Sequence, residues 1–247
     1  MKHKPLTYRE IDSTNAEAAR LLRSGNLPGG VVILTDYQSS GRGQEKNVWV
    51  SDPGKNILMS WIVYPAFLSV QDQFQLSKAV SLAITDFLGA HSLDARIKWP
   101  NDILCSDAKI CGILIENGIM GGQIRHSIVG IGLNVRQERF PEFPWKATSM
   151  FLEAGTDVAP GGLAASLAGF LDLRYDQLAG GGAEVINRAY LQRLYRLDVP
   201  SIFTDGRSQF TGVVRGVDDS GRLRVEAGAG ITSYGFHEIR MLCRSGS

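Results

Sequence analysis

The sequence of 247 residues lacks most of the features that covalent cross-links and metal sites require. It has three cysteines, an odd number without any C-x-x-C pair, so neither a disulfide framework nor a cysteine zinc site is favoured. Its four histidines are scattered along the chain, which argues against a histidine metal site. A reducing compartment fits this composition best, so we expect a cytoplasmic protein.

Long apolar runs and an excess of one charge are also absent. No run of about 18 apolar residues exists that would span a membrane, and the N-terminus carries no apolar signal segment. The 26 Lys and Arg residues balance 25 Asp and Glu residues, which predicts neither nucleic acid nor an anionic membrane as the main partner. With 44 % apolar residues, the chain suits one globular domain of about 200 residues and a small appendage.

What the sequence does contain is a mixture of helix and strand patterns. Thr14 and Glu17 form a T-x-x-E pattern, which predicts a capping box at the start of an amphipathic helix. We expect strands at 6–11, 30–35, 56–63 and 95–99, helices at 13–24, 71–89, 161–178 and 183–196, and a hairpin with strands 110–116 and 123–135 around residues 117–122.

The C-terminal part of the chain has a different character. Between Asp198 and Leu242 no helix pattern occurs, and short strand patterns alternate with turn sequences at 205–206, 218–221 and 228–230. This predicts a small β-barrel of about 50 residues. The boundary is expected near residue 196, which gives one domain of residues 1–196 and a second of residues 197–247.

A glycine-rich stretch at 38–43, Gln-Ser-Ser-Gly-Arg-Gly, is the first candidate for ligand binding. Gly41 and Gly43 let the backbone approach an anion closely, and Arg42 offers a planar fork of donors for a phosphate or carboxylate. Alone, the pattern fits an ordinary surface loop with one solvated arginine better than a binding site. It is neither a P-loop nor a dinucleotide fingerprint, because the required lysine and third glycine are missing. Residues 39–47 have no apolar side chain, which predicts a mobile loop.

A charged stretch follows at 98–102 (Lys-Trp-Pro-Asn-Asp), and Lys109 lies directly before an apolar strand. Lys109 is either an ordinary residue at the end of a strand or a point charge that stabilises a carboxylate or acyl-phosphate oxygen. Asp102 is suited to hold Mg²⁺ together with substrate phosphates, or to orient an attacking amine. Trp99 and Trp49 fit positions in the core or in the wall of a site.

Polar groups at 13–15 (Ser-Thr-Asn) and a glycine-rich strand end at 130–134 complete the set. Capping a helix needs only one hydroxyl, so the surplus groups at 13–15 can face the polar head of a ligand, with the Gln38 amide nearby. The glycines of 130–134 indicate close approach of a ligand or of another backbone. Asn134, the last residue of this stretch, has a side-chain amide, which is suited to recognise the edge of a nucleotide base by paired hydrogen bonds.

The order of these motifs resembles that of biotin protein ligases: Ser-Thr-Asn, Gln-x-x-Gly-Arg-Gly, Lys-Trp-Pro-Asn-Asp, Lys-x-x-Gly-Ile-Leu and Gly-x-Gly-x-Asn. The match covers about residues 8–136, and the C-terminal barrel matches by placement only. The resemblance implies a mixed β-sheet flanked by helices, similar to class II aminoacyl-tRNA synthetase cores, with an SH3-like C-terminal β-barrel. It also implies that ATP and Mg²⁺ convert biotin to biotinyl-5′-AMP. A lysine of a biotin carboxyl carrier protein domain then attacks this intermediate.

The resemblance implies roles for individual residues as well. Lys109, Arg42 and Asp102 would be catalytic, and the 39–47 loop would close over the intermediate to exclude water. Mg²⁺ would be bound mainly through the ATP phosphates, with Asp102 as its candidate protein ligand and no dedicated metal site. The implied substrate-binding residues are Ser13, Thr14, Asn15, Gln38, Gly41, Arg42, Gly43, Gln44, Trp49, Lys109, Gly112 and Asn134. Among these, Ser13, Thr14, Gln38 and Gly112 would contact biotin and Asn134 would contact adenine.

The sequence departs from the family pattern at Gln44, where some members have a second arginine. Retention of the charged intermediate then rests more on Arg42 and Lys109, and leakage of the adenylate is expected to be greater. Some members also carry an N-terminal helix-turn-helix module, for which this chain has no room before its first motif, so we expect no DNA binding.

Three other functions remain open at this point. A lipoate ligase or octanoyl transferase would share the core fold but should lack the arrangements at 38–43 and 98–102. A non-catalytic biotin-binding module would not need Arg42 and Lys109 together. An aminoacyl-tRNA synthetase paralogue would need a basic RNA surface, which the charge balance does not provide. An exposed strand edge after the central hairpin also allows a homodimer.

Overall fold

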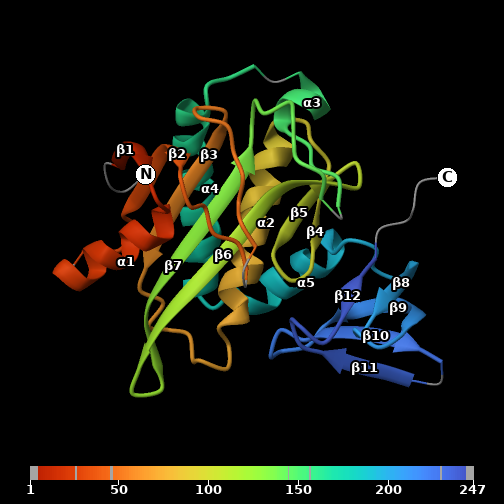
Figure 1. Ribbon diagram of the computed structural model, residues 1–247. Coiled ribbons are helices and arrows are strands. Elements are labelled where there is room, and N and C mark those ends of the chain that lie inside the picture. The colour runs from red at the N-terminus through yellow and green to blue at the C-terminus, as the bar shows by residue number, and fades with distance from the viewer. Residues whose placement is uncertain are drawn as a thin grey trace.

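The computed structural model describes residues 5–25, 27–44, 47–143, 145–155, 157–228 and 230–242. Its larger sheet has seven strands in the order β1-β2-β3-β7-β6-β5-β4 (Figure 1). These strands are β1 (Leu6–Ile11), β2 (Val32–Gln38), β3 (Asn56–Val63), β4 (Ala95–Lys98), β5 (Asp102–Cys105), β6 (Ala108–Met120) and β7 (Gln123–Asn134). Strand β1 pairs in parallel with β2, and β2 pairs antiparallel with β3, so the sheet is mixed.

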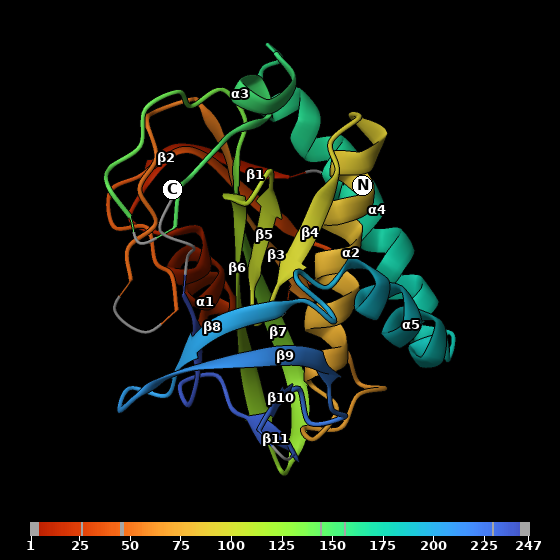
Figure 2. The ribbon, with the colours of Figure 1, turned by 90° about the vertical axis from the view of Figure 1, so that its right-hand side faces the viewer.

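Helices cover both faces of this sheet. On one face lie α2 (Phe74–Ala90) and α4 (Pro160–Ala179), with α5 (Ala183–Arg193) beside α2, and on the other lies α1 (Thr14–Ser24) (Figure 2). All eight residues of β3 are buried, because the strand is covered on both faces, which explains its continuous apolar run. A short helix, α3 (Met150–Ala154), follows the segment after β7. No helix among the described residues is long and apolar enough to span a membrane.

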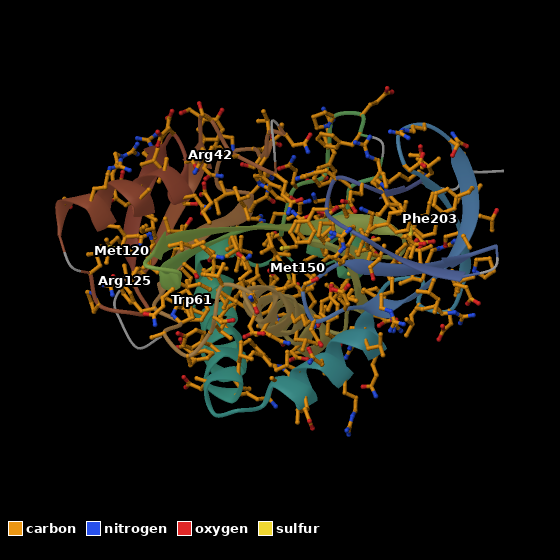
Figure 3. The ribbon with its side chains drawn as sticks, turned by 90° about the horizontal axis from the view of Figure 1, so that it is seen from below. Arg42, Trp61, Met120, Arg125, Met150 and Phe203 are labelled. Atoms are coloured by element: carbon orange, nitrogen blue, oxygen red, sulfur yellow. The ribbon has the colours of Figure 1, made fainter. Side chains whose placement is uncertain are left out.

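A second sheet, here called the C-terminal sheet, is formed by the last five strands in the order β11-β10-β9-β8-β12. The strands are β8 (Pro200–Thr204), β9 (Gln209–Val217), β10 (Leu223–Ala227), β11 (Gly230–Tyr234) and β12 (Arg240–Met241), and every pairing is antiparallel. Strands β11 and β12 end the order without pairing with each other in the described part of the chain, so no closed barrel is found. Figure 3 shows Phe203 in this sheet, at the opposite end of the molecule from Met120 and Arg125 at the β6–β7 tip.

The predicted mixture of helices and strands is confirmed, with three local corrections. The prediction of a capping box is wrong, because Ser13 is the N-cap residue of α1 and its side chain makes no capping hydrogen bond. Residues 117–120 are not a loop but continue β6, and the chain turns at Gly121 and Gly122, whose φ angles of 59° and 74° suit a tight hairpin. Strand β5 and helix α3 were not predicted.

Candidate active site

A cavity of about 950 Å³ lies between one face of the seven-stranded sheet, the segment 41–49 and the C-terminal sheet. Its wall contains all but one of the site residues expected from the sequence; the exception is Gly41. The expected residues in the wall are Ser13, Thr14, Asn15, Gln38, Arg42, Gly43, Gln44, Trp49, Asp102, Lys109, Gly112 and Asn134. Motifs from distant parts of the sequence therefore meet in one place.

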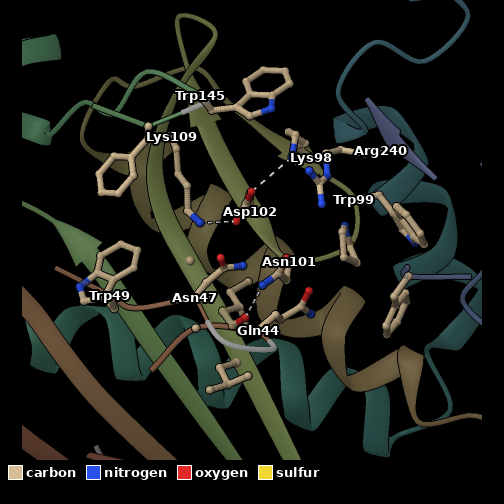
Figure 4. A pocket seen from close by; sticks show the side chains of 18 of the residues that line it. Gln44, Asn47, Trp49, Lys98, Trp99, Asn101, Asp102, Lys109, Trp145 and Arg240 are labelled. Atoms are coloured by element: carbon tan, nitrogen blue, oxygen red, sulfur yellow. Dashed lines mark hydrogen bonds and ion pairs between the residues drawn. The ribbon is translucent and has the colours of Figure 1, made fainter. Parts of the chain in front are cut away.

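Three charged side chains, Lys98, Asp102 and Lys109, form what we call the lysine–aspartate cluster (Figure 4). Lys109 Nζ lies 2.6 Å from Asp102 Oδ1, and Lys98 Nζ lies 3.3 Å from Asp102 Oδ2. Burial raises the pKa of the Asp102 carboxyl, but the two ammonium groups lower it by more, so that its pKa lies below the ordinary value. Two cations share one anion, and the cluster therefore presents a net positive charge to the cavity.

Strand pairing explains why these three residues meet. Lys98 and Asp102 are register partners on the β4–β5 hairpin. The next turn, at Ser106 and Asp107, has φ angles of 47° and 63° and returns the chain antiparallel, so that Lys109 lies near the start of β6 and pairs with Leu104 of β5. The Lys109 backbone is also held from its other side, because its N–H donates to the Lys146 carbonyl oxygen across 2.7 Å. The cluster thus stands on strand ends rather than on loops.

The start of α1 contributes Ser13, Thr14 and Asn15 to the cavity wall. The backbone N–H and the hydroxyl of Thr14 both donate to Gln38 Oε1, at 2.8 and 3.2 Å. Glu17 is engaged elsewhere, by Arg20 and Tyr8, which explains why the capping box does not form. The Ser13 hydroxyl lines the cavity, and none of the described residues bonds to it. This corner offers a hydroxyl and an amide to a polar ligand.

Asn15 organises the side of the cavity that carries Arg42. Its Oδ1 accepts a hydrogen bond from the Ser60 hydroxyl at 2.5 Å, and its Nδ2 donates to Glu116 Oε2 at 2.7 Å. The same Glu116 oxygen lies 2.9 Å from a guanidinium nitrogen of Arg42. A side chain on Gly130 would overlap Asn15, so this position needs a glycine. Glu116, which sequence reasoning missed, is thus the ion-pair partner of Arg42.

The segment 41–49 folds back on itself, although residues 45 and 46 lie outside the described residues. Its two arms are joined by hydrogen bonds from Gly43 N–H to the Asn47 carbonyl and from Trp49 N–H to the Gly41 carbonyl, at 2.8 and 3.0 Å. A Cβ on Gly41 would overlap the carbonyl oxygen of Trp49, so Gly41 serves this fold rather than lining the cavity. The predicted mobility of the 39–47 loop stays a prediction.

Trp49 lies over a pair of glycines in the sheet. Gly112 on β6 and Gly132 on β7 are direct register partners. A side chain on Gly132 would overlap the Trp49 indole, and a Cβ on Gly112 would come within 3.0 Å of it. The indole Nε1 is buried with no hydrogen-bond partner in the described structure, and Lys109 Nζ lies 5.7 Å from the ring centroid. Because neither glycine has a side chain, the two leave a flat patch of sheet backbone, on which planar or thin groups can pack.

Asn134, at the end of β7, has one engaged and one free polar atom. Its Nδ2 donates to the Thr148 carbonyl across 2.9 Å, while its Oδ1 is buried without a partner among the described residues. A buried acceptor without a partner is costly, which makes it a natural site for a ligand donor. Aromatic residues missed by sequence reasoning also line the cavity, namely Phe140, Phe143 and Trp145. Lys98 Nζ lies 4.8 Å from the Trp145 ring.

A metal site built by the protein alone was not expected, and the described residues contain no group of three His, Cys, Asp or Glu side chains able to hold an ion. Both oxygens of Asp102 contact lysines, which leaves this carboxylate poorly placed to hold a divalent cation by itself. Gln44, the position that departs from the arginine pattern, lies in the cavity wall.

Comparison with known sequences agrees with this site. Residues 7–134 match the profile of the biotin/lipoate A/B protein ligase family. The biotin–acetyl-CoA-carboxylase ligase of Paracoccus denitrificans is 34% identical over 231 residues, which cover 89% of this chain and 92% of that protein. The bifunctional ligase/repressor BirA of Bacillus spizizenii is 32% identical over 235 residues, which cover 92% of this chain and 70% of that protein.

Comparison with solved structures supports the fold. The biotin protein ligase of Aquifex aeolicus, solved in complex with biotin and ATP, superposes with a TM-score of 0.80 at 22% sequence identity. The match covers 96% of this chain and 98% of that one, so both the seven-stranded sheet and the C-terminal sheet fall within the shared architecture.

Proposed function

This chain belongs to the biotin/lipoate A/B protein ligase family, and we propose that it is a biotin protein ligase. In the proposed reaction, ATP activates biotin to biotinyl-5′-AMP, and the biotinyl group passes to a lysine of a biotin carboxyl carrier domain. The observation that carries the proposal is the lysine–aspartate cluster, which faces one cavity together with Arg42 and the free acceptor of Asn134. The similarity to the Paracoccus ligase along almost its whole length supports the same conclusion.

The first half-reaction, the adenylation of biotin, needs positive charge near the reacting carboxylate and phosphate oxygens. A biotin carboxylate oxygen attacks the α-phosphorus of ATP, a new C–O–P linkage forms, and the bond to pyrophosphate breaks. Lys109 is suited to stabilise the charge on the carboxylate and α-phosphate oxygens, because its ammonium stands in the cavity on a fixed strand end. Lys98 adds a second cation within reach of the same carboxylate, Asp102.

Asp102 acts in this scheme as a positioning residue. It fixes the two ammonium groups and offsets part of their mutual repulsion. In the second half-reaction, the amine of the carrier lysine attacks the acyl carbon, and AMP leaves with the electrons of the cleaved acyl–oxygen bond. The attacking amine gives its proton to water or to the departing AMP phosphate, and the Asp102 carboxylate in the cavity wall is suited to orient the amine.

The two ends of the cavity suit the two ends of biotinyl-5′-AMP. Asn134 Oδ1 can accept a hydrogen bond from the adenine amino group, and the aromatic residues 140, 143 and 145 suit a planar base. Ser13, Thr14 and Gln38 provide hydroxyl and amide groups for the polar head of biotin. Gly112 has no side chain and would let biotin approach the sheet backbone beside the Trp49 indole and Lys109.

Arg42, on the 41–49 segment, lines the same cavity. In the described structure Arg42 pairs with Glu116, and its guanidinium is half exposed. A phosphate that enters the cavity can replace Glu116 as the partner of Arg42, because it accepts two parallel hydrogen bonds as a carboxylate does and carries further negative charge. Closure of the segment, with Trp49 packed on Gly112 and Gly132, would exclude water from biotinyl-5′-AMP. This intermediate is a mixed anhydride, which water hydrolyses.

Mg²⁺ belongs to the proposal through the nucleotide. Among the described residues there is no group of three His, Cys, Asp or Glu side chains able to hold an ion, and Mg²⁺ is proposed to bind mainly through the ATP phosphates. There it would neutralise phosphate charge, and Asp102 in the cavity wall is the candidate protein carboxylate beside it.

We also infer the organisation of the chain from the family. A catalytic domain of residues 1–196 and a C-terminal domain of residues 197–247 agree with the change from the last helix, α5, to the C-terminal sheet. An SH3-like barrel for that sheet, a core related to class II aminoacyl-tRNA synthetases, a cytoplasmic location and a homodimer remain parts of this proposal. The acceptor is proposed from the Paracoccus relative, whose name specifies acetyl-CoA carboxylase.

Pyrophosphate exchange tests the proposal directly. Purified protein with Mg²⁺ and ATP should incorporate labelled pyrophosphate into ATP when biotin is present, and not when lipoate or octanoate replaces it. Exchange with lipoate would move the assignment to the lipoate branch of the family. Tight biotin binding with no exchange for any of the three acids would indicate a binding module. Addition of a biotin carboxyl carrier domain should then give one biotinyl mass increment on its lysine.

A further inference from the structure

The C-terminal sheet contacts the rest of the molecule directly behind the lysine–aspartate cluster. The indole Nε1–H of Trp99 donates to the carbonyl oxygen of Gly221 across 2.9 Å, and this bond is buried. Trp99 is the first residue of the turn 99–101, which joins β4 to β5. Lys98 is the last residue before this turn, and Asp102 is the first residue after it. The bond therefore links the C-terminal sheet to the backbone that carries two members of the cluster.

Aromatic packing surrounds this bond. The Phe236 ring, from the segment after β11, lies 5.4 Å from the Trp99 ring and 5.9 Å from the Phe74 ring, measured between centroids. Gly221 has a φ of 89°, and a Cβ there would lie 2.5 Å from Phe74 Cγ. A glycine is thus required on two grounds, backbone conformation and close approach. We call these four residues the aromatic joint.

The turn 218–222, on the C-terminal side of the joint, is held internally. The Gly221 N–H donates to the Asp218 carbonyl at 3.0 Å, and the Asp218 carboxylate accepts from Arg222 N–H at 2.9 Å and from the Ser220 hydroxyl at 2.7 Å. The Gly221 carbonyl is therefore presented to Trp99 by a stiff turn.

The turn 99–101 is equally constrained on the catalytic side. Asn101 Nδ2 donates to the Ile113 carbonyl at 2.8 Å, and Ile113 N–H donates to the Asn101 carbonyl at 2.9 Å. Lys98 and Asp102 face each other where this turn closes the β4–β5 hairpin. Trp99 is therefore followed by a braced turn, through which a displacement of its side chain would reach Lys98 and Asp102.

We propose that Trp99 is a positioning residue that couples the seating of the C-terminal sheet, through its hydrogen bond to Gly221, to the geometry of the lysine–aspartate cluster. The inference rests on the proposed function, since it assigns the cluster its role in adenylation. Simple packing of a tryptophan would not require the indole N–H. The coupling does, because this bond is directional and joins the two turns.

Three variants separate coupling from packing. Trp99→Phe keeps an aromatic ring but removes the N–H, and Gly221→Ala pushes the turn 218–222 away from Phe74. Gly228→Ala is the matched control: Gly228 lies in another turn of the C-terminal sheet, also at positive φ (58°), and a Cβ there has nothing within 4 Å. Circular dichroism and thermal melting establish that each variant is folded.

The first measurement does not depend on activity. Competitive labelling with acetic anhydride, read by mass spectrometry, compares Lys98 and Lys109 with Lys55 as an internal reference. Both cluster lysines should label several-fold faster in Trp99→Phe and Gly221→Ala, because Asp102 no longer holds them, and at the wild-type rate in Gly228→Ala. Unchanged labelling in Trp99→Phe overturns the proposal, and so does equal labelling in the two glycine variants.

The second measurement is biotin-dependent pyrophosphate exchange. The kcat should fall by about 10- to 100-fold in Trp99→Phe at unchanged KM for biotin, as expected for misplaced catalytic groups. An unchanged kcat, or a change in KM alone, contradicts the coupling. If wild-type protein exchanges with no acid, the proposed function fails, while the labelling result still decides whether the joint controls the cluster. If Gly221→Ala does not fold, Trp99→Phe decides alone.

Discussion

The cavity contains two acid–base pairings that differ in how firmly the protein holds them. In the lysine–aspartate cluster, the Asp102 side chain is 15% exposed and both of its oxygens contact lysines based on strand ends. In the Arg42–Glu116 pair the side chains are 47% and 39% exposed, and Arg42 stands on the 41–49 segment. Charges with little solvent contact interact strongly and are costly to separate, whereas exposed pairs contribute little and exchange readily. The lysine–aspartate cluster is therefore the firmer pairing, and in the proposed function the Arg42–Glu116 pair is the one that a ligand replaces.

The largest effect is expected from removal of Lys109. Lys109→Ala should lower the rate of biotin adenylation by about 10²- to 10³-fold, because its charge is most needed when the transition state forms. The dissociation constant of ATP should change far less. Pre-steady-state measurement of biotinyl-5′-AMP formation, beside equilibrium ATP titration, checks both quantities. Equal losses in rate and in ATP binding would sink the assignment of Lys109 as a transition-state residue.

A second large effect concerns Asp102 and stability. Asp102→Asn leaves two lysines without their anion and should lower the free energy of unfolding at pH 7 by about 3 kcal/mol. The folded pKa of Asp102 lies below its ordinary value, so its stabilisation is complete above the unfolded pKa and is lost as pH falls through the folded one.

Denaturant unfolding of wild type and Asp102→Asn between pH 2 and pH 7 checks this sign. The difference between the two proteins should be constant above about pH 5 and shrink below pH 4. A difference that grows on acidification would show that Asp102 is not stabilised as an anion by the lysines.

Much of the site was predictable, because short charged and glycine-rich motifs carry chemistry wherever the fold places them. Strand β3 matched its expected bounds, since a strand buried on both faces is apolar without interruption. The gathering of the motifs followed from the family resemblance, and the cavity brings them together. Without the resemblance, residue type and spacing would have left two interpretations open: Lys109 as an ordinary residue at a strand end, and Arg42 as a solvated residue of a surface loop.

Other features could not be predicted, because they depend on contacts between distant residues. Gly118 was taken as a turn residue, yet it lies inside β6 because the His126 ring covers it and leaves no room for a side chain. Strand β5 has four residues after a proline turn, too few to show a period. Glu116 has the appearance of a surface acid until Asn15 and Arg42 are found on the same carboxylate oxygen.

An intermediate effect is expected at Arg42. Arg42→Gly should raise the rate of release of biotinyl-5′-AMP by about tenfold, because one charge-assisted contact to the phosphate is lost. Released adenylate should then label lysines of bystander proteins. Mass spectrometry of biotinylated lysines on added serum albumin measures this, with Arg9→Gly on β1 as a charge-matched control. An unchanged labelling pattern would count against Arg42 as a clamp.

The reciprocal change tests the departure at position 44. Gln44→Arg adds a second cation to the cavity wall and should lengthen the lifetime of the bound adenylate several-fold. The measurement is the time-resolved loss of isolated enzyme-bound biotinyl-5′-AMP, with Gln44→Leu as a neutral control. Equal lifetimes for Gln44→Arg and wild type would refute the idea that this position governs leakage.

The smallest effect, and the sharpest test of the comparison, is at Glu116. Glu116→Gln keeps an acceptor for Asn15 but removes the anion that competes with phosphate for Arg42. An exposed pair is worth about 0.2–1 kcal/mol, so the dissociation constant of biotinyl-5′-AMP should fall by a factor of about 1.5 to 5. Glu10→Gln on β1 makes the same change in net charge away from the cavity and should have no effect. The gain should vanish in an Arg42→Gly background and shrink at high salt. Weaker binding in Glu116→Gln would mean that Glu116 holds Arg42 in its working position, and the two pairings would then both be fixed.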